Sequence, residues 1–174
     1  GAPIPEAYGG AGMDYISFAI LCEELERADT AFRVVQSVHV GLNSLTLLQW
    51  GTEEQKQKFL IPLSNGTSLG CGAFTESGCG SDVSAVQTSA KRDGDFYILN
   101  GEKMWISLAS KADYAMVVAR TNPDAQKPSA GLSSFIVDLH SEGVKTGDLH
   151  GKLGVRAGST GWRARSTPCS MRGQ

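Results

Sequence analysis

The chain has 174 residues, a formal net charge of −2 and a hydrophobic content of 41%. This length allows one domain or two small ones, and the composition is ordinary for a globular protein. A net charge so close to zero gives no electrostatic reason to expect nucleic acid or an anionic membrane surface as a partner. No run of about 18 apolar residues is present and no secretory leader is recognisable, so we expect no membrane span.

The cysteines and histidines are too scattered to predict a disulfide framework or a metal site. No two cysteines form a C-x-x-C pair. We therefore expect reduced thiols, as in bacterial cytoplasm or the mitochondrial matrix, and no bound metal. The residues concerned are Cys22, Cys71, Cys79, Cys169, His39, His140 and His150. His39 lies near an apolar stripe without a recognisable acidic or nucleophilic partner, which favours a partly buried structural histidine over a catalytic one.

The first 66 residues have the periodicity of helices. Asp14 can cap one helix, and a second is predicted from Thr30 to a stop at Gly51. The predicted apolar stripes are Tyr15, Phe18, Cys22 and Leu25 in the first helix, and Val35, Val38, Leu42 and Leu45 in the second. Thr52 and Gln55 form a capping box for a third helix, which we expect to end before Pro62 because proline disfavours helical backbone at Ile61.

From Leu69 onward the pattern changes to that of β-strands. Val86, Thr88 and Ala90 alternate with polar residues before an Asp-Gly-Asp turn at 93–95, and Phe96 and Ile98 alternate after it. Asn100-Gly101 predicts a tight hairpin turn. The apolar run 114–119 predicts a buried strand, and 134–139 another. The chain is thus predicted as α+β, with a helical part at 1–66 and a β domain at 67–174.

Two segments of the β half are rich in groups that suit a planar, hydrogen-bonding ligand. The segment 71–82 is dense in Gly, Ser and Thr, which leave backbone N–H groups accessible. The segment 100–107 ends in a large flat aromatic residue, Trp105, beside the hydroxyl of Ser107. Taken alone, a tryptophan at this spacing is more often part of a core than the wall of a cofactor site.

Taken together, Phe74-Thr75-Glu76 to Gly80-Ser81-Asp82 and Asn100-Gly101-x-Lys103-x-Trp105-Ile106-Ser107 resemble the flavin-binding signature of acyl-CoA dehydrogenases. The resemblance covers about residues 4–161. It implies part of an N-terminal helical domain followed by an antiparallel β-barrel that binds flavin and substrate, with a C-terminal helical-bundle domain absent from the chain. The first residue is Gly, and we expect a fragment of a longer enzyme.

The resemblance also implies roles for individual residues around FAD. Thr75 would bind the pyrimidine side of the flavin, Ser107 would donate near its N5 edge, and Trp105 would cover the ring face away from the substrate. Ser81 would contact both the cofactor and the acyl-CoA. The full set of expected cofactor-binding residues is Gly72, Phe74, Thr75, Gly80, Ser81, Trp105, Ile106 and Ser107. No G-x-G-x-x-G follows a strand, which disfavours a Rossmann mode of binding.

The implied activity is FAD-dependent α,β-dehydrogenation of an acyl-CoA thioester to the 2-enoyl-CoA. Electrons would pass to an electron-transfer flavoprotein, and the full-length enzyme would be a dimer or tetramer. No catalytic residue is expected in this chain, because the family's catalytic glutamate lies in the C-terminal domain. A flavin oxidase or monooxygenase on the same scaffold, or a non-catalytic β-barrel binding module, remains an alternative. Residues 162–174 lack the expected alternation and are predicted to be atypical, as after a frameshift.

Overall fold

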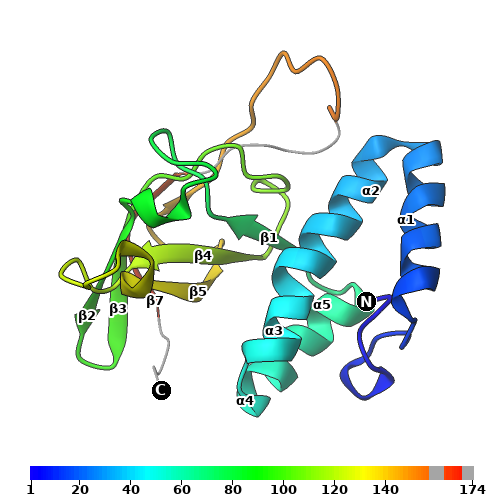
Figure 1. The fold of residues 1–174 in the computed structure, drawn as a ribbon, viewed down its shortest axis with the longest axis horizontal. Helices are drawn as coiled ribbons and strands as arrows, with labels where there is room; N and C mark the ends of the chain where they lie inside the picture. The colour runs from blue at the N-terminus through cyan, green and yellow to red at the C-terminus, as the bar shows by residue number, and fades with distance from the viewer. Residues whose placement is uncertain (157–162, 170–174) are drawn as a thin grey trace.

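The computed structural model describes residues 1–156 and the backbone of 163–169, and it divides into a helical part and a β part that lie side by side (Figure 1). The helices are η1 (Glu6–Tyr8), α1 (Tyr15–Ala28), α2 (Thr30–Gln36), η2 (Ser37–Ser44), α3 (Leu45–Trp50), α4 (Glu53–Gln55), η3 (Lys56–Leu60) and α5 (Ile61–Asn65). The strands are β1 (Gly70–Ala73), β2 (Ser89–Asp93), β3 (Phe96–Gly101), β4 (Tyr114–Arg120), β5 (Leu132–Asp138), β6 (Val144–Lys145) and β7 (Arg163–Cys169), with short turns η4 (Val83–Ala85) and η5 (Pro128–Gly131). The α+β prediction is confirmed.

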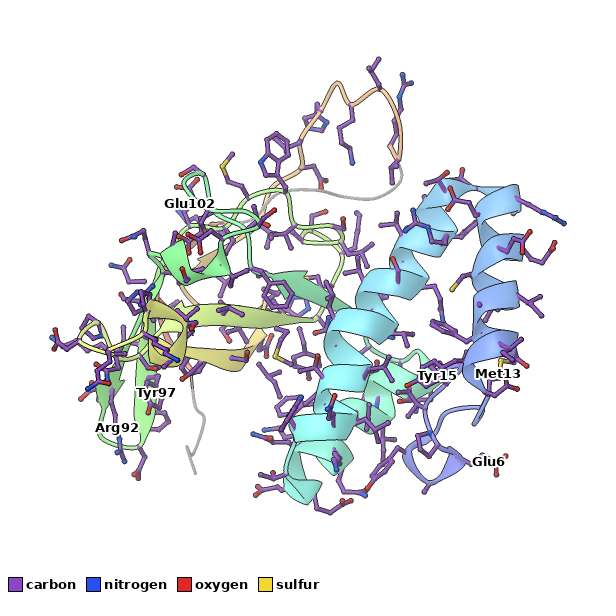
Figure 2. All side chains as sticks on the ribbon, viewed as in Figure 1. Glu6, Met13, Tyr15, Arg92, Tyr97 and Glu102 are labelled. Carbon is purple, nitrogen blue, oxygen red and sulfur yellow. The ribbon has the colours of Figure 1, made fainter. Side chains whose placement is uncertain are left out.

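Helix α1 begins where its capping residue predicted. The Asp14 side chain accepts hydrogen bonds from the backbone N–H groups of Ile16 and Ser17, at 2.8 and 3.0 Å. The predicted stripe is only half-buried in this chain, and its first member, Tyr15, is 69% exposed. Helix α1 lies against α2 on the side away from the β part (Figure 1). Met13 and Tyr15 lie at the N-terminal end of α1 (Figure 2).

The second predicted helix is one helical stretch from α2 through η2 to α3, and Gly51 follows its end. Its middle, η2, has the wider turn of a π-helix. Leu42, predicted to lie in the apolar stripe, is 37% exposed, although its side chain lies against Gly72 of β1. The buried positions are instead His39, Val40, Asn43, Ser44 and Leu47.

The third helical stretch begins with both hydrogen bonds of the predicted capping box, between Thr52 and Gln55. It does not end before Pro62, because Ile61 is helical at φ −60° and ψ −52°. Pro62 lies in the first turn of α5, where no intrahelical bond requires its missing N–H. The stretch ends at Asn65, and Gly66 takes the left-handed conformation, φ 81°.

The sheet is mixed, and the prediction of a wholly antiparallel barrel is wrong. Strand β1 pairs in parallel with β4 from Gly70↔Tyr114 to Ala73↔Val117, and β2 meets the same strand in parallel at Ser89↔Arg120. Strands β4 and β5 pair antiparallel along their whole length. The order β1-β4-β2-β3-β7-β6, with β5 beside β4, makes β4 the strand around which the sheet is arranged. Its buried apolar residues confirm the predicted strand at 114–119.

The β2–β3 hairpin turns at 93–95 as predicted, whereas the further turn predicted at Asn100-Gly101 does not form. Gly94 has φ 58°, whereas Asn100 and Gly101 lie within β3 and Asn100 pairs with Ser89. Gly101 is required for packing, since a Cβ there would lie 2.3 Å from Thr88 Oγ1. The inward face of β3 carries Leu99, while Phe96, predicted to alternate inward, is 48% exposed.

Two apolar clusters hold the chain together. The larger lies within the sheet and includes Phe135, Val117, Leu99 and Ile106. The second joins the two parts, because Leu47, Leu60 and Leu63 of the helices pack with Met116 and Ile136 of the sheet. Strand β1 contributes Cys71 and Ala73 to the larger cluster, against which Val35 and Val38 of the helices also pack.

The backbone of 163–169 forms strand β7, which pairs antiparallel with β3 and β6. The missing alternation therefore did not prevent a strand within the segment predicted to be atypical. Residues 162 and 170–174 of that prediction lie outside the described residues. Among the residues that the structure describes, no helix is both long and apolar enough to cross a membrane.

Candidate functional site

The two segments singled out in the sequence meet directly in the structure. The backbone N–H of Met104 donates to the carbonyl oxygen of Thr75 at 2.9 Å. The Lys103 Nζ donates to the carbonyl oxygen of Phe74 at 3.0 Å. Both contacts tie the loop that follows β1 to the segment that follows β3. Glu102, the neighbour of Lys103, lies at the end of the β2–β3 hairpin opposite Arg92 (Figure 2), so the meeting point is far from the hairpin turn.

A buried ion pair lies between the two segments. Lys103 Nζ is 2.8 Å from Glu76 Oε1, and the two side chains are 0% and 7% exposed. Glu76 also accepts from the N–H of Gln87 at 2.7 Å and from the N–H and hydroxyl of Thr88. Burial opposes ionisation of Glu76, but the hydrogen bonds from Lys103, Thr88 and the two amides outweigh it and hold the pKa of this carboxyl below its ordinary value.

The segment after Lys103 has an unusual backbone. Trp105 and Leu108 have φ angles of 58° and 70°, in the left-handed region that residues with a side chain seldom adopt. The Trp105 side chain is 60% exposed, whereas Ile106 and Leu108 are buried in the sheet core. The interpretation of Trp105 as a core residue is therefore wrong within this chain. The buried neighbours anchor the segment, and the backbone turns the indole outward.

The other predicted cofactor residues lie in three different environments. Gly72 is buried in β1, and a Cβ there would lie 2.6 Å from Leu42 Cδ1, so helix packing alone accounts for this glycine. Phe74 is half-buried against the cluster that joins the two parts. Thr75 and Ser107 are half-buried beside Met104 and Ile106, while Gly80 and Ser81 are exposed. No atom outside its neighbours lies within 4 Å of a Cβ built at Gly80, so its backbone is open to a ligand.

Sequence reasoning missed the partnership of Glu76 and Lys103. Both residues lie inside the quoted motifs, but no local pattern in the sequence marks Lys103 as buried. The structure also explains why neither nearby carboxylate was assigned as a catalytic base. Glu76 is bound on both oxygens, and Asp82 accepts from the backbone N–H of Ser84 at 3.1 Å as the cap of η4.

His39 is structural, as predicted, and connects the helical part to the sheet. Its Nδ1 accepts from the backbone N–H of Gly70 at 2.9 Å, so its Nε2 carries the proton that is donated to the Leu63 carbonyl oxygen at 2.8 Å. Burial lowers the pKa of this imidazole, which keeps it neutral. These bonds fix the start of β1, five residues before Thr75.

A separate surface hollow lies in the loop before the undescribed residues. It is lined by Leu149, His150, Gly151, Lys152, Leu153 and Arg156, which all belong to one loop. None of the predicted flavin residues contributes to it. The hollow is therefore not the site that the two motifs form.

Comparison with known proteins identifies the family of this chain and agrees with its fold. The acyl-CoA dehydrogenase middle-domain model matches residues 71–163, and the N-terminal-domain model of the same family matches 1–67. The chain belongs to the acyl-CoA dehydrogenase family. The human mitochondrial short-chain specific acyl-CoA dehydrogenase is 40% identical over 157 residues, which are 90% of this chain and 38% of that protein.

Solved structures of the family have the same fold. Butyryl-CoA dehydrogenase from Megasphaera elsdenii is 34% identical, with a TM-score of 0.92 over all of this chain and 47% of its own. A glutaryl-CoA dehydrogenase from Mycobacterium smegmatis, solved in complex with FADH2, is 35% identical with a TM-score of 0.86 over 94% of this chain and 41% of its own. The present chain thus spans less than half the length of the relatives it matches.

Proposed function

We propose that this chain carries the flavin-facing part of an FAD-dependent acyl-CoA dehydrogenase that converts an acyl-CoA to its 2-enoyl-CoA. The observation that carries the proposal is Trp105, an exposed indole on left-handed backbone directly beside the Gly, Ser and Thr loop. An aromatic side chain oriented outward by strained backbone is costly unless it binds something. The family's solved relatives include one that holds reduced FAD.

The residues present fit a flavin. The indole of Trp105 offers a flat apolar surface for one face of the ring system. Thr75 and Ser107 lie on the two joined segments and supply hydroxyl groups for the polar edges of the ring. The open backbone at Gly80 and the exposed Ser81 suit the approach of a phosphate or of the acyl-CoA. FAD, when bound, supplies the acceptor for the hydride that leaves the substrate's β-carbon.

The chain's own residues position the reaction rather than move its proton. Glu76 and Asp82 are both engaged in structural hydrogen bonds, so neither is assigned as the base that removes the α-proton. We infer that the full-length enzyme supplies this base, passes electrons to an electron-transfer flavoprotein and assembles as a dimer or tetramer.

Anaerobic mixing of the FAD-loaded full-length protein with saturated acyl-CoA thioesters of increasing chain length tests the proposal. We expect bleaching of the flavin absorbance by at least one of them and formation of the 2-enoyl product. A flavin oxidase on this scaffold would instead show rapid reoxidation by air. A protein that binds no flavin would contradict both and favour a binding module.

A further inference from the structure

The geometry points to Lys103 and Glu76 as a positioning pair that sets the spacing between the Thr75 and Trp105 segments, on which flavin binding depends. This inference rests on the proposed function. Its basis is the contact between the two segments and the complete burial of a lysine whose ammonium pairs with the Glu76 carboxylate.

Lys103 links the segments from one side. Its Nζ reaches the main chain just before Thr75, at the Phe74 carbonyl, and the side chain just after it, at Glu76. The next residue along the chain, Met104, donates to the Thr75 carbonyl itself. Three consecutive residues, 74–76, are therefore held by two consecutive residues, 103 and 104. Trp105 follows Met104 directly, so its orientation depends on how these two segments are aligned.

Glu76 links the segments from the other side to the approach to β2. Its two oxygens bind the backbone N–H groups of Gln87 and Thr88, and its own backbone pairs with Cys79 in both directions, at 2.9 and 3.2 Å. The backbone of Glu76 thereby closes the loop 76–79, while its carboxylate holds the ammonium. The ion pair orients three segments and adds no net charge beneath the proposed ring site.

Stability alone does not explain a buried ion pair. Removing two charges from water costs free energy that their attraction in a protein interior seldom exceeds, and apolar residues of similar size are often as stable. A pair that persists in such a place is better explained by the geometry it enforces. If so, neutral replacements can leave the fold stable and still weaken the site.

Two variants and one control separate positioning from stability. Lys103→Met removes the ammonium and its bond to Phe74, while the Glu76 carboxylate keeps its bonds to Gln87 and Thr88. Lys103→Met/Glu76→Gln also removes the charge left unpaired. His39→Ala is the matched control, because this buried side chain also makes two hydrogen bonds to distant groups, yet it touches none of the residues proposed to bind flavin.

FAD affinity, urea unfolding and amide hydrogen exchange at Met104 are measured for each full-length protein. We expect both Lys103 variants to bind FAD at least about tenfold more weakly and to lose protection at Met104. The double variant is expected to recover resistance to urea relative to Lys103→Met without recovering affinity. His39→Ala should lose resistance to urea and keep protection at Met104.

Wild-type affinity and Met104 protection in both Lys103 variants would overturn the inference and leave the pair a purely structural contact. Failure of the proposed function gives a different result, since the wild-type protein would then bind no FAD. In that case Met104 exchange still decides the positioning role: unchanged protection in Lys103→Met overturns it, and lost protection supports it.

Discussion

His39 shows how one buried residue ties the helices to the strand that leads into the site. Its neutral imidazole accepts from Gly70 and donates to Leu63, and protonation of Nδ1 would abolish the first bond. Because burial lowers the folded-state pKa below the ordinary value of about 6.5, the unfolded chain binds more protons as pH falls below that value. The free energy of unfolding contributed by this group is therefore retained above about pH 6.5 and falls as the pH drops below it.

We predict that the protein loses stability as the pH falls below about 6.5 and that His39→Gln removes part of this loss. Urea unfolding at pH 7.5 and 5.5 should show a larger drop for the wild-type protein than for His39→Gln, since glutamine can donate and accept but cannot titrate in this range. The positive charge of the Gly1 amine also lowers the pKa of the imidazole, so the comparison should be repeated with the amine acetylated. Equal drops in the two proteins would show that other groups carry the pH dependence.

Thr75 and Ser107 carry a second prediction at the residue scale. Each is proposed to make one hydrogen bond to the flavin, worth about 1 kcal/mol net. If that bond differs between oxidised and reduced flavin by a similar amount, Thr75→Ala and Ser107→Ala should each shift the two-electron potential by about 20 mV. Redox titration measures this, with Ser37→Ala on η2 as the control. Unchanged potentials in both variants would remove these residues from the site.

At the scale of elements, the strongest local signals were the helix caps. Asp14 and the Thr52–Gln55 box both formed as predicted, because a cap depends only on residues within one turn. Thr52→Ala should lower the free energy of unfolding by about 1 kcal/mol, as measured in urea. Thr52→Ser, which keeps the hydroxyl, is the control and should lose much less.

Elements whose geometry depends on distant residues were predicted less well. The turn at 93–95 formed as predicted, but Asn100-Gly101, a typical turn sequence, lies within β3, where Gly101 leaves space for the Thr88 side chain of a neighbouring segment. The π-helical turns of η2 were not predicted, because apolar spacing does not reveal them. The parallel pairing of β1 with β4 joins residues 44 positions apart, beyond the reach of any local pattern.

In the candidate site too, local features were predicted and features that depend on distant contacts were not. Its residues were found in two short motifs, but the Glu76–Lys103 pair and the outward orientation of Trp105 depend on contacts between those motifs. Gly101→Ala tests this dependence at the element scale, because the added methyl group would collide with Thr88, which binds Glu76. We expect weaker FAD binding together with lower resistance to urea, whereas Gly78→Ala, which has open space, should change neither much.

For the whole molecule, we expect that the 174-residue chain supplied with FAD does not oxidise acyl-CoA. Removal of the α-proton by a positioned base typically contributes about 10²–10⁴ in rate. The carboxylates of Glu76 and Asp82, in the segment 71–82, are held in other bonds. Dye reduction with a series of acyl-CoA substrates measures this, with the full-length protein as the positive control. FAD-dependent turnover by the chain alone would direct the search for the base to Glu76 or Asp82.

The central claim is that the flavin lies against Trp105, and FAD affinity of Trp105→Ala in the full-length protein tests it most directly. Trp50→Ala is the matched control, because that indole is also exposed, at 77%, and lies at the end of α3. Loss of a stacked indole worth about 2–3 kcal/mol should weaken FAD binding by roughly 30- to 150-fold and shift the flavin absorption bands. Trp50→Ala should leave both unchanged. Normal affinity and an unchanged spectrum in Trp105→Ala would contradict the proposed site.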